Sequence, residues 1–596
     1  MRVCDYIADF IYKQGIKDVF MVSGGGLMYL TDGLACNEDL NTVCCHHEQA
    51  AAMAACGYAK YNDMGCCYVT TGCGGTNTMT GLLNAWQDCT PVLFVSGQCK
   101  RVETIRFTGA KIRQFGVQEA DIISLVKPLT KYSVMIEDPL EIRYHMEKAF
   151  YLARSLRPGP VWIDVPMDVQ AAEINEKELK GFDPYELYPE KQTATEREIE
   201  DICGYFREAE RPVIIAGHGV RLSGATELFG QFVRKHHIPF VSSRLGTDVL
   251  PTEDDLYIGR IGNKGTRAGN FAVQNADLVL ALGSRLSVSS TGQQYELFAR
   301  EAKVVVVDID KFEHTKNTVH IDRLIISDVR DVLERLSMDE DIRFDEWAEK
   351  CLRWKKMWPV CLPEYYEEPG AINMYVFVEE LSKQLRKDSV VIGDAGSAVY
   401  VPPQAIKTTT PEQRYITSGA QAEMGFSLPA AVGVSVARGG GEVLAITGDG
   451  SLQMNLQELQ TLKHYGLSVK LFVWNNDGYL SIRATQRKFF NGRFIGTDKT
   501  NGVSFPDLEK LSEAYGLKYI RIGNTAELAE KLSEVLSLEE PVVCDVMILR
   551  DQEVIPSISS KEIDGKLVSM PPEDMYPFLD REVFENEMVV RPVTER

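Results

Sequence analysis

The sequence lacks the features that would place the protein in a membrane or on a nucleic acid. It has no apolar run near the roughly 18 residues that a bilayer-spanning helix needs. Residues 1–16 are typical of an amphipathic helix rather than of a signal peptide. Lysine and arginine number 64 against 85 aspartates and glutamates, which gives a net charge of −21. Because phosphate backbones and anionic lipids repel an acidic surface, we expect no nucleic acid and no membrane as partners.

Regularly paired cysteines are also missing. The 14 cysteines are scattered over 596 residues, which favours free thiols in a reducing compartment over a disulfide framework. We therefore predict a cytoplasmic protein. The length exceeds what one hydrophobic core supports, so several domains are expected.

Strand and helix signals alternate along the chain. In the first part, the strand signals are short apolar runs at 19–22, 42–45, 67–71, 92–96 and 161–165. Such alternation predicts the α/β class, with doubly wound parallel sheets. Polar, charged stretches interrupt the pattern, and we predict three domains at 1–172, 190–335 and 370–550, followed by an irregular arm at 551–596.

A carboxylate and an amide follow two neighbouring strand signals in the last third of the chain. Asp449 follows the run at 443–447, and Asn476 follows the run at 469–474. Leucines from residue 452 onward recur at helical spacing, and Gly466 is suited to close that helix. Parallel strands joined by one helix bring both side chains to the same edge of a sheet. Their oxygens suit Mg²⁺, although a turn with polar caps would use the same residues.

Two further residues lie in apolar stretches. Glu48 lies at a predicted strand–helix junction in HHEQAAAMAACGYAK. A carboxylate there is either functional or a first-turn residue that complements the helix dipole. Met424 lies in SGAQAEMGFSLPAA, where a methionine can equally fill a core. Neither pattern is decisive by itself.

Taken together, these stretches resemble the thiamine-diphosphate enzymes, and specifically those of the acetolactate synthase type. The match consists of G-D-G at 448–450, N-N at 475–476, and H-E-Q with G-Y-A around Glu48. The resemblance covers about residues 1–550. It implies a pyrimidine-binding, a central and a diphosphate-binding domain.

The resemblance implies roles for the residues singled out above. Asp449, Asn476 and the carbonyl of Gly478 would bind the Mg²⁺ that holds the diphosphate of the cofactor. Glu48 would be the catalytic carboxylate, because a carboxyl group at N1′ of the aminopyrimidine promotes loss of the thiazolium C2 proton. Met424 would support the bent cofactor, and the carbonyl of Ala422 would meet its 4′-amino group.

The implied cofactor site includes small residues of several loops, which let backbone N–H groups approach phosphate. Its members are Gly25, Gly26, Thr71, Gly72, Gly396, Ser397, Ala398, Ala422, Met424, Gly448, Gly450, Ser451, Asn476, Gly478, Tyr479 and Leu480.

The resemblance also implies partners and a second cofactor. Active sites would form between the first domain of one chain and the third domain of another, so we expect a homodimer or a tetramer. FAD is a candidate for the central domain, with Arg157 and Arg285 as phosphate partners. Residues 286–289, however, are Leu-Ser-Val-Ser where an acidic, arginine-bearing loop is typical. FAD binding is therefore left open.

The acceptor pocket implied by the resemblance departs from acetolactate synthase. Val117 replaces a phenylalanine, Met167 a lysine, and Thr485 the tryptophan that selects 2-ketobutyrate. These changes predict an open pocket that lacks the usual preference. The remaining pocket residues are Gln118, Ser481 and Arg483. Four polar side chains of the following stretch either contact a polar or phosphorylated acceptor or are simply solvated: Arg483, Gln486, Arg487 and Lys488.

The leading hypothesis is a carboligase that uses thiamine diphosphate and Mg²⁺. It would decarboxylate a 2-keto acid, pyruvate in the first place, and transfer the two-carbon unit to a carbonyl acceptor such as a keto-sugar nucleotide. The alternatives are an authentic acetolactate synthase of branched-chain amino-acid synthesis, a C–C lyase or hydrolase, and a non-catalytic member. The last must explain why Glu48, Asp449 and Asn476 are all present.

Overall fold

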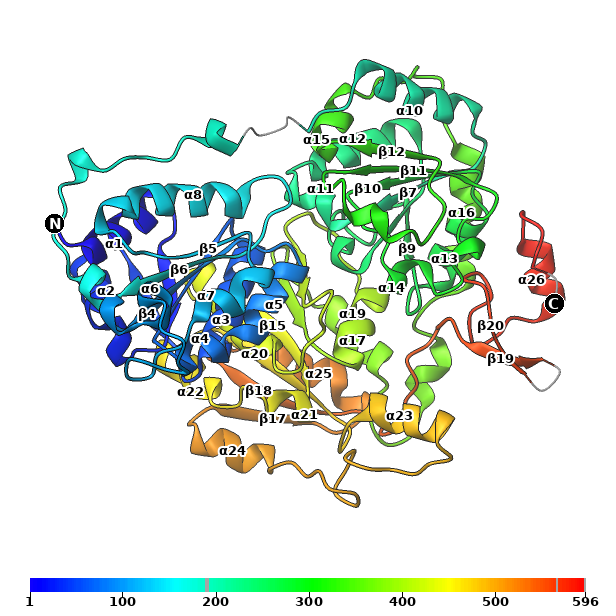
Figure 1. Cartoon of the computed structure of the whole chain (residues 1–596). Helices are drawn as coiled ribbons and strands as arrows, with labels where there is room; N and C mark the ends of the chain where they lie inside the picture. The colour runs from blue at the N-terminus through cyan, green and yellow to red at the C-terminus, as the bar shows by residue number, and fades with distance from the viewer. Residues whose placement is uncertain (188–191, 564–565, 594–596) are drawn as a thin grey trace.

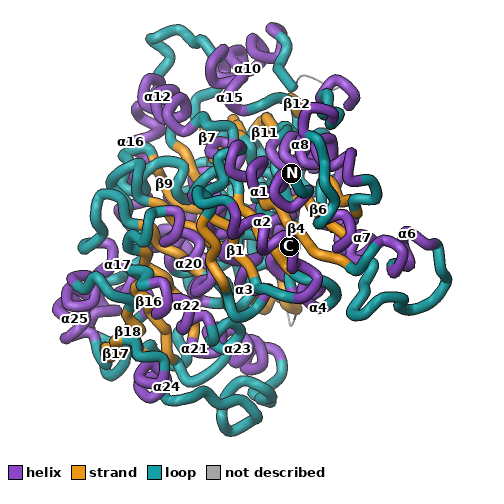
Figure 2. Tube along the Cα trace, turned by 90° about the vertical axis from the view of Figure 1, so that its left-hand side faces the viewer, coloured by secondary structure: helices purple, strands orange, loops and turns teal. Residues whose placement is uncertain are grey.

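Three six-stranded parallel sheets, each flanked by helices, form the body of the molecule (Figure 1). The computed structural model describes residues 1–187, 192–563 and 566–593. Figure 2 shows the strands enclosed by helices, which explains why most strand residues are buried. The predicted fold class, three doubly wound parallel-sheet domains, is confirmed.

The first domain has the strand order β2-β1-β3-β4-β6-β5. Its strands are β1 (Asp18–Met21), β2 (Asn41–Cys44), β3 (Gly65–Val69), β4 (Val92–Gln98), β5 (Tyr132–Met135) and β6 (Val161–Pro166). Its helices are α1 (Val3–Lys13), α2 (Met28–Cys36), α3 (Glu48–Tyr61), α4 (Cys73–Asn77), α5 (Met79–Gln87), α6 (Ile105–Thr108), α7 (Ile122–Val126), α8 (Ile142–Arg154) and α9 (Met167–Gln170). The five predicted strands overlap β1, β2, β3, β4 and β6, whereas β5 was not predicted.

The central domain has the strand order β12-β11-β10-β7-β8-β9. Its strands are β7 (Pro212–Ala216), β8 (Phe240–Ser242), β9 (Tyr257–Arg260), β10 (Leu278–Leu282), β11 (Lys303–Asp308) and β12 (Arg323–Ile326). Its helices are α10 (Glu196–Glu208), α11 (His218–Leu222), α12 (Thr226–His236), α13 (Arg267–Gln274), α14 (Val288–Thr291), α15 (Val329–Arg335) and α16 (Asp345–Met357).

The third domain has the strand order β14-β13-β15-β16-β18-β17. Its strands are β13 (Val390–Gly393), β14 (Arg414–Thr417), β15 (Val443–Gly448), β16 (Val469–Asn475), β17 (Lys518–Ile522) and β18 (Val542–Met547). Its helices are α17 (Met374–Ser382), α18 (Ser397–Tyr400), α19 (Pro402–Ala405), α20 (Ser427–Ala437), α21 (Asp449–Leu452), α22 (Glu458–Tyr465), α23 (Leu480–Phe489), α24 (Leu508–Ala514) and α25 (Thr525–Ser537).

The helix predicted between β15 and β16 is interrupted. It consists of α21 and α22, separated by residues 453–457. The break coincides with Asn455, whose Nδ2 donates to the carbonyl of Gly425 at 2.8 Å. Gly466 ends α22 in the left-handed conformation at φ 61°, as predicted. The prediction of one continuous helix was wrong because Asn455 is bound to another segment.

The C-terminal arm is more regular than predicted. It contains the antiparallel hairpin of β19 (Ser560–Ile563) and β20 (Lys566–Ser569), and helix α26 (Arg581–Glu587). Phe584 contacts Phe271 of the central domain, while the buried Glu573 pairs with Arg300 at 2.7 Å and accepts from Gln274 at 2.8 Å. The arm therefore belongs to the central domain's packing. Residues 188–191, at the predicted start of the central domain, and residues 564–565 and 594–596 of the arm lie outside the described residues.

The first and third domains of one chain pack tightly through α3 and α20. A Cβ atom on Gly57 would overlap the carbonyl of Ala430, and one on Gly433 would overlap that of Ala54. Only glycine allows this approach of the two helix backbones. The close approach fixes α3, and Glu48 at its start, relative to the third sheet.

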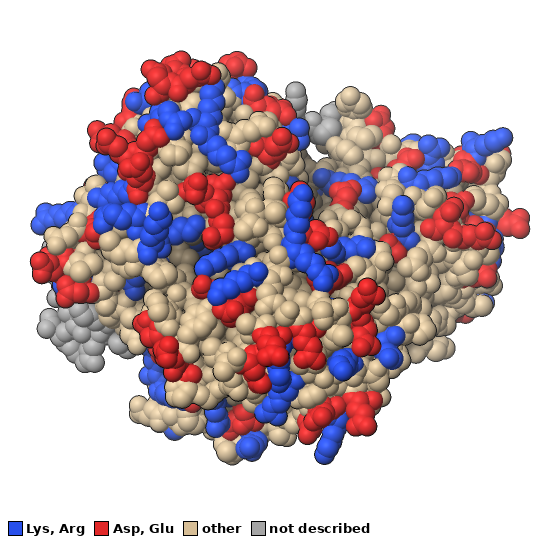
Figure 3. Space-filling model, turned by 180° about the vertical axis from the view of Figure 1, so that it is seen from behind, with Lys and Arg blue, Asp and Glu red and all other residues tan. Residues whose placement is uncertain are grey.

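The surface carries acidic and basic side chains side by side. Figure 3 shows both kinds intermingled over one face of the molecule. Among the described residues, no helix is both long and apolar enough to cross a bilayer.

Candidate active site

The two polar strand ends predicted from the sequence meet at one edge of the third sheet. β15 and β16 are parallel neighbours, with Gly448 opposite Trp474. Asp449 follows directly, and its Oδ2 accepts from the backbone N–H groups of Asn476 at 3.2 Å and Gly478 at 3.0 Å. The predicted juxtaposition of Asp449 with the asparagine loop is therefore present.

The electrostatics of this loop suit a cation. Asp449 is 4% exposed, and burial raises its pKa to about 6, against the opposing effect of three backbone N–H donors. The Oδ1 atom of Asn476 is buried and has no hydrogen-bond partner among the described residues. A divalent cation would satisfy that oxygen and favour the ionised form of Asp449. The residues present thus fit Mg²⁺.

A second buried carboxylate connects the neighbouring turn to the same helix. Asp394 follows β13, is fully buried, and its Oδ2 accepts from Ser451 Oγ at 2.6 Å and Thr447 Oγ1 at 2.8 Å. Burial raises its pKa to about 6. Asp394 was not among the site residues predicted from the sequence. Its position directly after a buried strand, as for Asp449, was the available signal.

Ser451 also holds the turn that contains Met424. Its Oγ accepts from the backbone N–H of Gly425 at 2.7 Å. Ala422 has φ +53°, a left-handed conformation that costs about 1–2 kcal/mol for a residue with a Cβ atom. Ser451 thus anchors the residue after Met424, while the N–H of Ala422 donates to Ser418 Oγ at 3.0 Å. The strained backbone at Ala422 is typical of functional turns.

Small residues line the adjoining surface of the third domain. Gly396 has φ +58°, and its backbone faces the hydroxyl of Ser481. Ser397 and Ala398 begin α18, while Tyr479 and Leu480 lie at the start of α23. A Cβ atom on Gly450 would overlap the ring of Tyr479. Tyr479 and Ser481 therefore bring the start of α23 against Gly450 and the turn of Gly396.

Glu48 is the first residue of α3, at the predicted strand–helix junction. It is half-buried, and its Oε2 accepts from Asn77 Nδ2 at 2.9 Å. The N-terminus of α3 is capped by His47, whose Nδ1 accepts from the N–H of Gln49 at 3.0 Å. The next residues of the helix, Ala50 to Ala55, are fully buried. Asn77 was not predicted, because it comes from another helix.

The predicted glycine loops of the first domain lie together. The N–H of Gly26 donates to Thr70 Oγ1 at 3.1 Å, and Thr71 Oγ1 donates to the carbonyl of Gly97 at 3.0 Å. The backbone of Gly72, at φ +67°, lies against the carbonyl of Gln118. Gly25 adjoins this cluster and is exposed. The cluster forms a surface of small side chains at the carboxyl edge of the first sheet.

Comparison with known proteins identifies this arrangement. Family models match three segments: "Thiamine pyrophosphate enzyme, N-terminal TPP binding domain" at residues 1–124, "central domain" at 199–336 and "C-terminal TPP binding domain" at 394–546. The chain belongs to the thiamine pyrophosphate enzyme family. It is therefore an enzyme that depends on thiamine diphosphate, as thiamine pyrophosphate is also called.

Several relatives are similar along almost the whole chain. The acetolactate synthase large subunit of Lactococcus lactis is 32% identical over 92% of this chain and 92% of its own length. The probable acetolactate synthase large subunit of Methanocaldococcus jannaschii is 34% identical, with 92% of each chain covered. The acetolactate synthase isozyme 2 large subunit of Escherichia coli is 32% identical over 94% of this chain and 97% of its own length. This thiamine pyrophosphate enzyme is thus of the acetolactate synthase type.

Glu48 lies in the matched N-terminal domain of this family member, and the loops of Asp449 and Asn476 lie in the matched C-terminal one. In the described single chain, no hydrogen bond or ion pair joins Glu48 to either loop.

One predicted acceptor contact was wrong. The side chain of Arg483 is only 2% exposed, and it donates to the carbonyls of Asn476 at 3.1 Å and Asp477 at 3.2 Å. It also donates to the carbonyl of Arg550 and pairs with Asp551 at 3.3 Å. Four of its five N–H donors therefore hold the asparagine loop to the start of the C-terminal arm, and its burial keeps the guanidinium out of reach of an acceptor.

We expect Arg483→Ala to weaken Mg²⁺ binding by about 10–100-fold, the usual effect of losing a group that orients metal ligands. The loop carbonyls of Asn476 and Asp477 would lose their buried donor. Arg487→Ala is the matched control, because Arg487 pairs with the same Asp551 at 3.0 Å but is exposed. Calorimetric titration of both variants with Mg²⁺ in the presence of thiamine diphosphate checks this. Equal affinities would contradict it.

The other predicted acceptor residues are accessible. Thr485 is exposed on α23 and donates to the carbonyl of Ser481 at 3.0 Å. Val117 is 84% exposed, Gln118 is exposed at φ +60°, and Met167 begins α9. In the described single chain, no hydrogen bond joins Val117 or Gln118 to α23.

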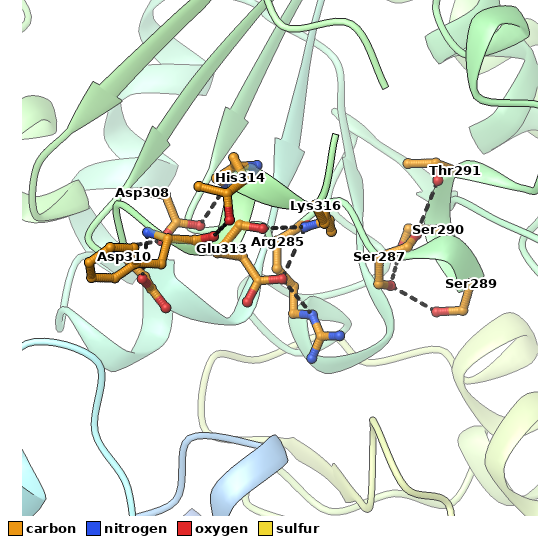
Figure 4. A network of polar contacts seen from close by, with 12 residues as sticks. Arg285, Ser287, Ser289, Ser290, Thr291, Asp308, Asp310, Glu313, His314 and Lys316 are labelled. Carbon is orange, nitrogen blue, oxygen red and sulfur yellow. Dashed lines mark hydrogen bonds and ion pairs between the residues drawn. The ribbon is translucent and has the colours of Figure 1, made fainter. Parts of the chain in front are cut away.

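A cavity of about 490 Å³ lies where the three domains meet. Arg157 and Arg285, the predicted phosphate partners, line it. Both are paired: Arg157 with Asp310 at 2.9 Å and Glu313 at 2.6 Å, and Arg285 with Glu313 at 3.4 Å. Figure 4 shows Arg285 beside Glu313, with Asp310 on one side and the hydroxyls of Ser287, Ser289, Ser290 and Thr291 on the other. The cavity size is typical of a small-molecule site.

Proposed function

We propose that this enzyme is a Mg²⁺-dependent carboligase that takes a two-carbon unit from pyruvate and transfers it to a carbonyl acceptor. The observation that carries the metal assignment is the buried, unpartnered Oδ1 of Asn476 beside Asp449. Asp449, Asn476 and the carbonyl of Gly478 would hold the ion, which would in turn hold the diphosphate. The acetolactate synthase names of the relatives support the carboligase reaction.

Thiamine diphosphate, when bound, supplies the centre that stabilises negative charge as a 2-keto acid loses CO₂. The protein must then position one proton relay. Glu48 would exchange a proton with the aminopyrimidine, and the N–H of Asn77 would hold its carboxyl group in place. The turn of Ala422 and Met424 would support the cofactor from the third domain.

The acceptor site is proposed to be open. Thr485, Val117 and Met167 offer less bulk or charge than the residues that the acetolactate synthase pattern has there, which supports a larger polar acceptor such as a keto-sugar nucleotide. Arg483 contributes nothing to such binding, and Lys488 donates to Ser559 at 3.0 Å. Acetolactate synthesis remains the alternative function, favoured by the names of the relatives.

We expect little preference for 2-ketobutyrate over pyruvate as acceptor. 2-Ketobutyrate has one CH₂ group more than pyruvate, and a fully buried CH₂ group contributes about 0.8 kcal/mol, or about fourfold in preference. Without an aromatic ring at position 485, this group loses its contact. Competition between the two acids, with product ratios read by mass spectrometry, measures this directly. Thr485→Trp should create the preference, and Arg487→Trp on the same helix should not.

A preference of tenfold or more for 2-ketobutyrate in the parent would overturn the open pocket and favour acetolactate synthesis. Absence of CO₂ release from pyruvate with every acceptor would overturn the carboligase itself. A lyase, a hydrolase or a non-catalytic member would then have to be considered.

The active site is proposed to be shared between two chains. Glu48 is half-buried in one chain, and large apolar side chains are exposed on both sides of the site. In the first domain these are Val102, Phe107, Ile112, Phe115, Val117 and Leu125, and in the third domain Ile482, Phe489, Phe490, Phe494 and Ile495. Exposed apolar surface of this extent usually marks an interface. A homodimer, with a tetramer as the larger option, would cover it.

FAD is proposed as the occupant of the three-domain cavity. Asp308, at the end of β11, is placed as ribose-binding carboxylates are in nucleotide-binding sheets. The pairing of Arg157 and Arg285 with carboxylates makes them poor phosphate ligands, so a flavin nucleotide would need other cations.

A further inference from the structure

The turn of Ala422 and Met424 rests on the first domain of the same chain. Asp88, which follows α5, accepts hydrogen bonds from the backbone N–H groups of Gly419 at 2.8 Å and Ala420 at 2.9 Å. Asp88 is buried, so these bonds are shielded from water. The backbone that leads into the turn is therefore fixed by the first domain, although the turn belongs to the third.

Glu423 makes a second connection, from within the turn itself. Its Oε1 accepts from Asn84 Nδ2 of α5 at 2.9 Å, and its Oε2 accepts from Ser418 Oγ. The same Ser418 Oγ accepts from the N–H of Ala422 at 3.0 Å. Asn84 is fully buried. One carboxyl group thus links α5 of the first domain to the hydroxyl that holds the strained residue Ala422.

Glu423 forms no ion pair with any residue that the structure describes. The charged groups that face it are Asp88 and Lys60 of α3, and these two form a buried ion pair with each other. The thiol of Cys56, also on α3, stays neutral because burial raises its pKa. Burial raises the pKa of Glu423 to about 7 against the opposing hydrogen bond from Ser418, and the charge of Asp88 adds to the rise.

The hydrogen-bonding groups around Glu423 also favour its acid form. Asn84 Oδ1 and Gln421 Oε1 are buried, and neither has a hydrogen-bond partner among the described residues. Gln421 Nε2 donates to the carbonyl of Thr80 at 3.4 Å, one helical turn before Asn84, so both amides lie along the same helix. A protonated carboxyl group adds a donor to this region, whereas a carboxylate adds only acceptors.

We propose that Glu423 is a positioning residue, which in its protonated form holds the turn of Ala422 and Met424 against α5. Ionisation would place an uncompensated negative charge between the two domains, beside the charge of Asp88. The acid form predominates below about pH 7 and is lost above it, so the turn should be held less firmly, and thiamine diphosphate bound less tightly, as the pH rises. The inference rests on the proposed cofactor role of this turn and is independent of the carbonyl acceptor.

The test measures the affinity of the full-length protein for thiamine diphosphate, with Mg²⁺ in excess, by calorimetry at pH 6 and pH 8. In Glu423→Gln, glutamine can accept from Asn84 and donate to Ser418 Oγ, but it cannot ionise. With a pKa of about 7, the acid form of the parent falls from about nine-tenths at pH 6 to about one-tenth at pH 8. The parent should therefore match Glu423→Gln at pH 6 and bind up to about tenfold more weakly than this variant at pH 8.

Comparison at the same pH removes the effects of other titrating groups, because the parent and Glu423→Gln share them. Glu412→Gln is the matched control, the same change at an exposed position of the third domain, and it should follow the parent at both pH values. Glu423→Ala removes the link to α5. It should weaken binding by about tenfold already at pH 6, the effect of leaving the buried Asn84 donor unpaired.

The proposal is overturned if the ratio of the parental and Glu423→Gln affinities is the same at pH 6 and pH 8. It is also overturned if Glu423→Ala binds within about twofold of the parent at pH 6. If Glu423→Ala does not fold, the comparison with Glu423→Gln decides alone. No readout uses turnover, so failure of the proposed carboligase reaction would leave the result of this test unchanged.

Discussion

Glu48→Gln should lower turnover by about 10²–10⁴-fold while thiamine diphosphate remains bound. Glutamine has the size of glutamate and keeps an oxygen that can accept from Asn77, so the start of α3 should not change. It cannot gain and lose a proton as a carboxyl group does. CO₂ release from pyruvate measures the turnover, and calorimetry measures the cofactor affinity.

The matched control is Glu38→Gln, the same change at an exposed position of the first domain. That variant should keep parental turnover. Turnover of Glu48→Gln within a factor of two of the parent would remove Glu48 from the mechanism. A loss of cofactor binding in the same variant would instead assign Glu48 a role in holding the cofactor.

The sequence allowed prediction of features that depend on strand order. Apolar runs before Asp449 and Asn476 predicted two neighbouring parallel strands, and the register of β15 with β16 brings the two residues into hydrogen-bonding distance. The start of the helix at Glu48 was also predictable, because the hydrophobic pattern changes there from that of a strand to that of a helix. Such features are local, and the sheet then determines their relative positions.

The features that were missed depend on contacts between distant segments. Arg483 looked like one of several exposed cations, because its partners are mainly backbone carbonyls, which leave no trace in the sequence. The break after α21 depends on Asn455 reaching Gly425. The arm lacks periodicity because single residues such as Glu573 and Phe584 anchor it to the central domain. Each of these required the tertiary structure.

Asp449→Asn should weaken binding of thiamine diphosphate with Mg²⁺ by about 100-fold or more. Loss of a group that only orients a metal ligand lowers metal affinity by about 10–100-fold. Removing the charge of a direct ligand should lower the affinity at least as much. Asp449 is only 4% exposed, and asparagine preserves the shape of its side chain. Asp477→Asn is the control, since Asp477 lies in the same loop but is exposed. Parental affinity in Asp449→Asn, measured by calorimetry, would exclude Asp449 as a ligand.

The same two variants also test whether the site is shared between chains. In a mixed dimer of Glu48→Gln and Asp449→Asn chains, a shared arrangement gives one site with both native residues and one site with neither. Random mixing makes half of the dimers mixed, so refolded mixtures should recover about a quarter of parental activity. Sites formed within single chains would recover none, because every chain then carries one defect. Activity of the mixture at the level of the separate variants would therefore place Glu48 and Asp449 in the same chain's site.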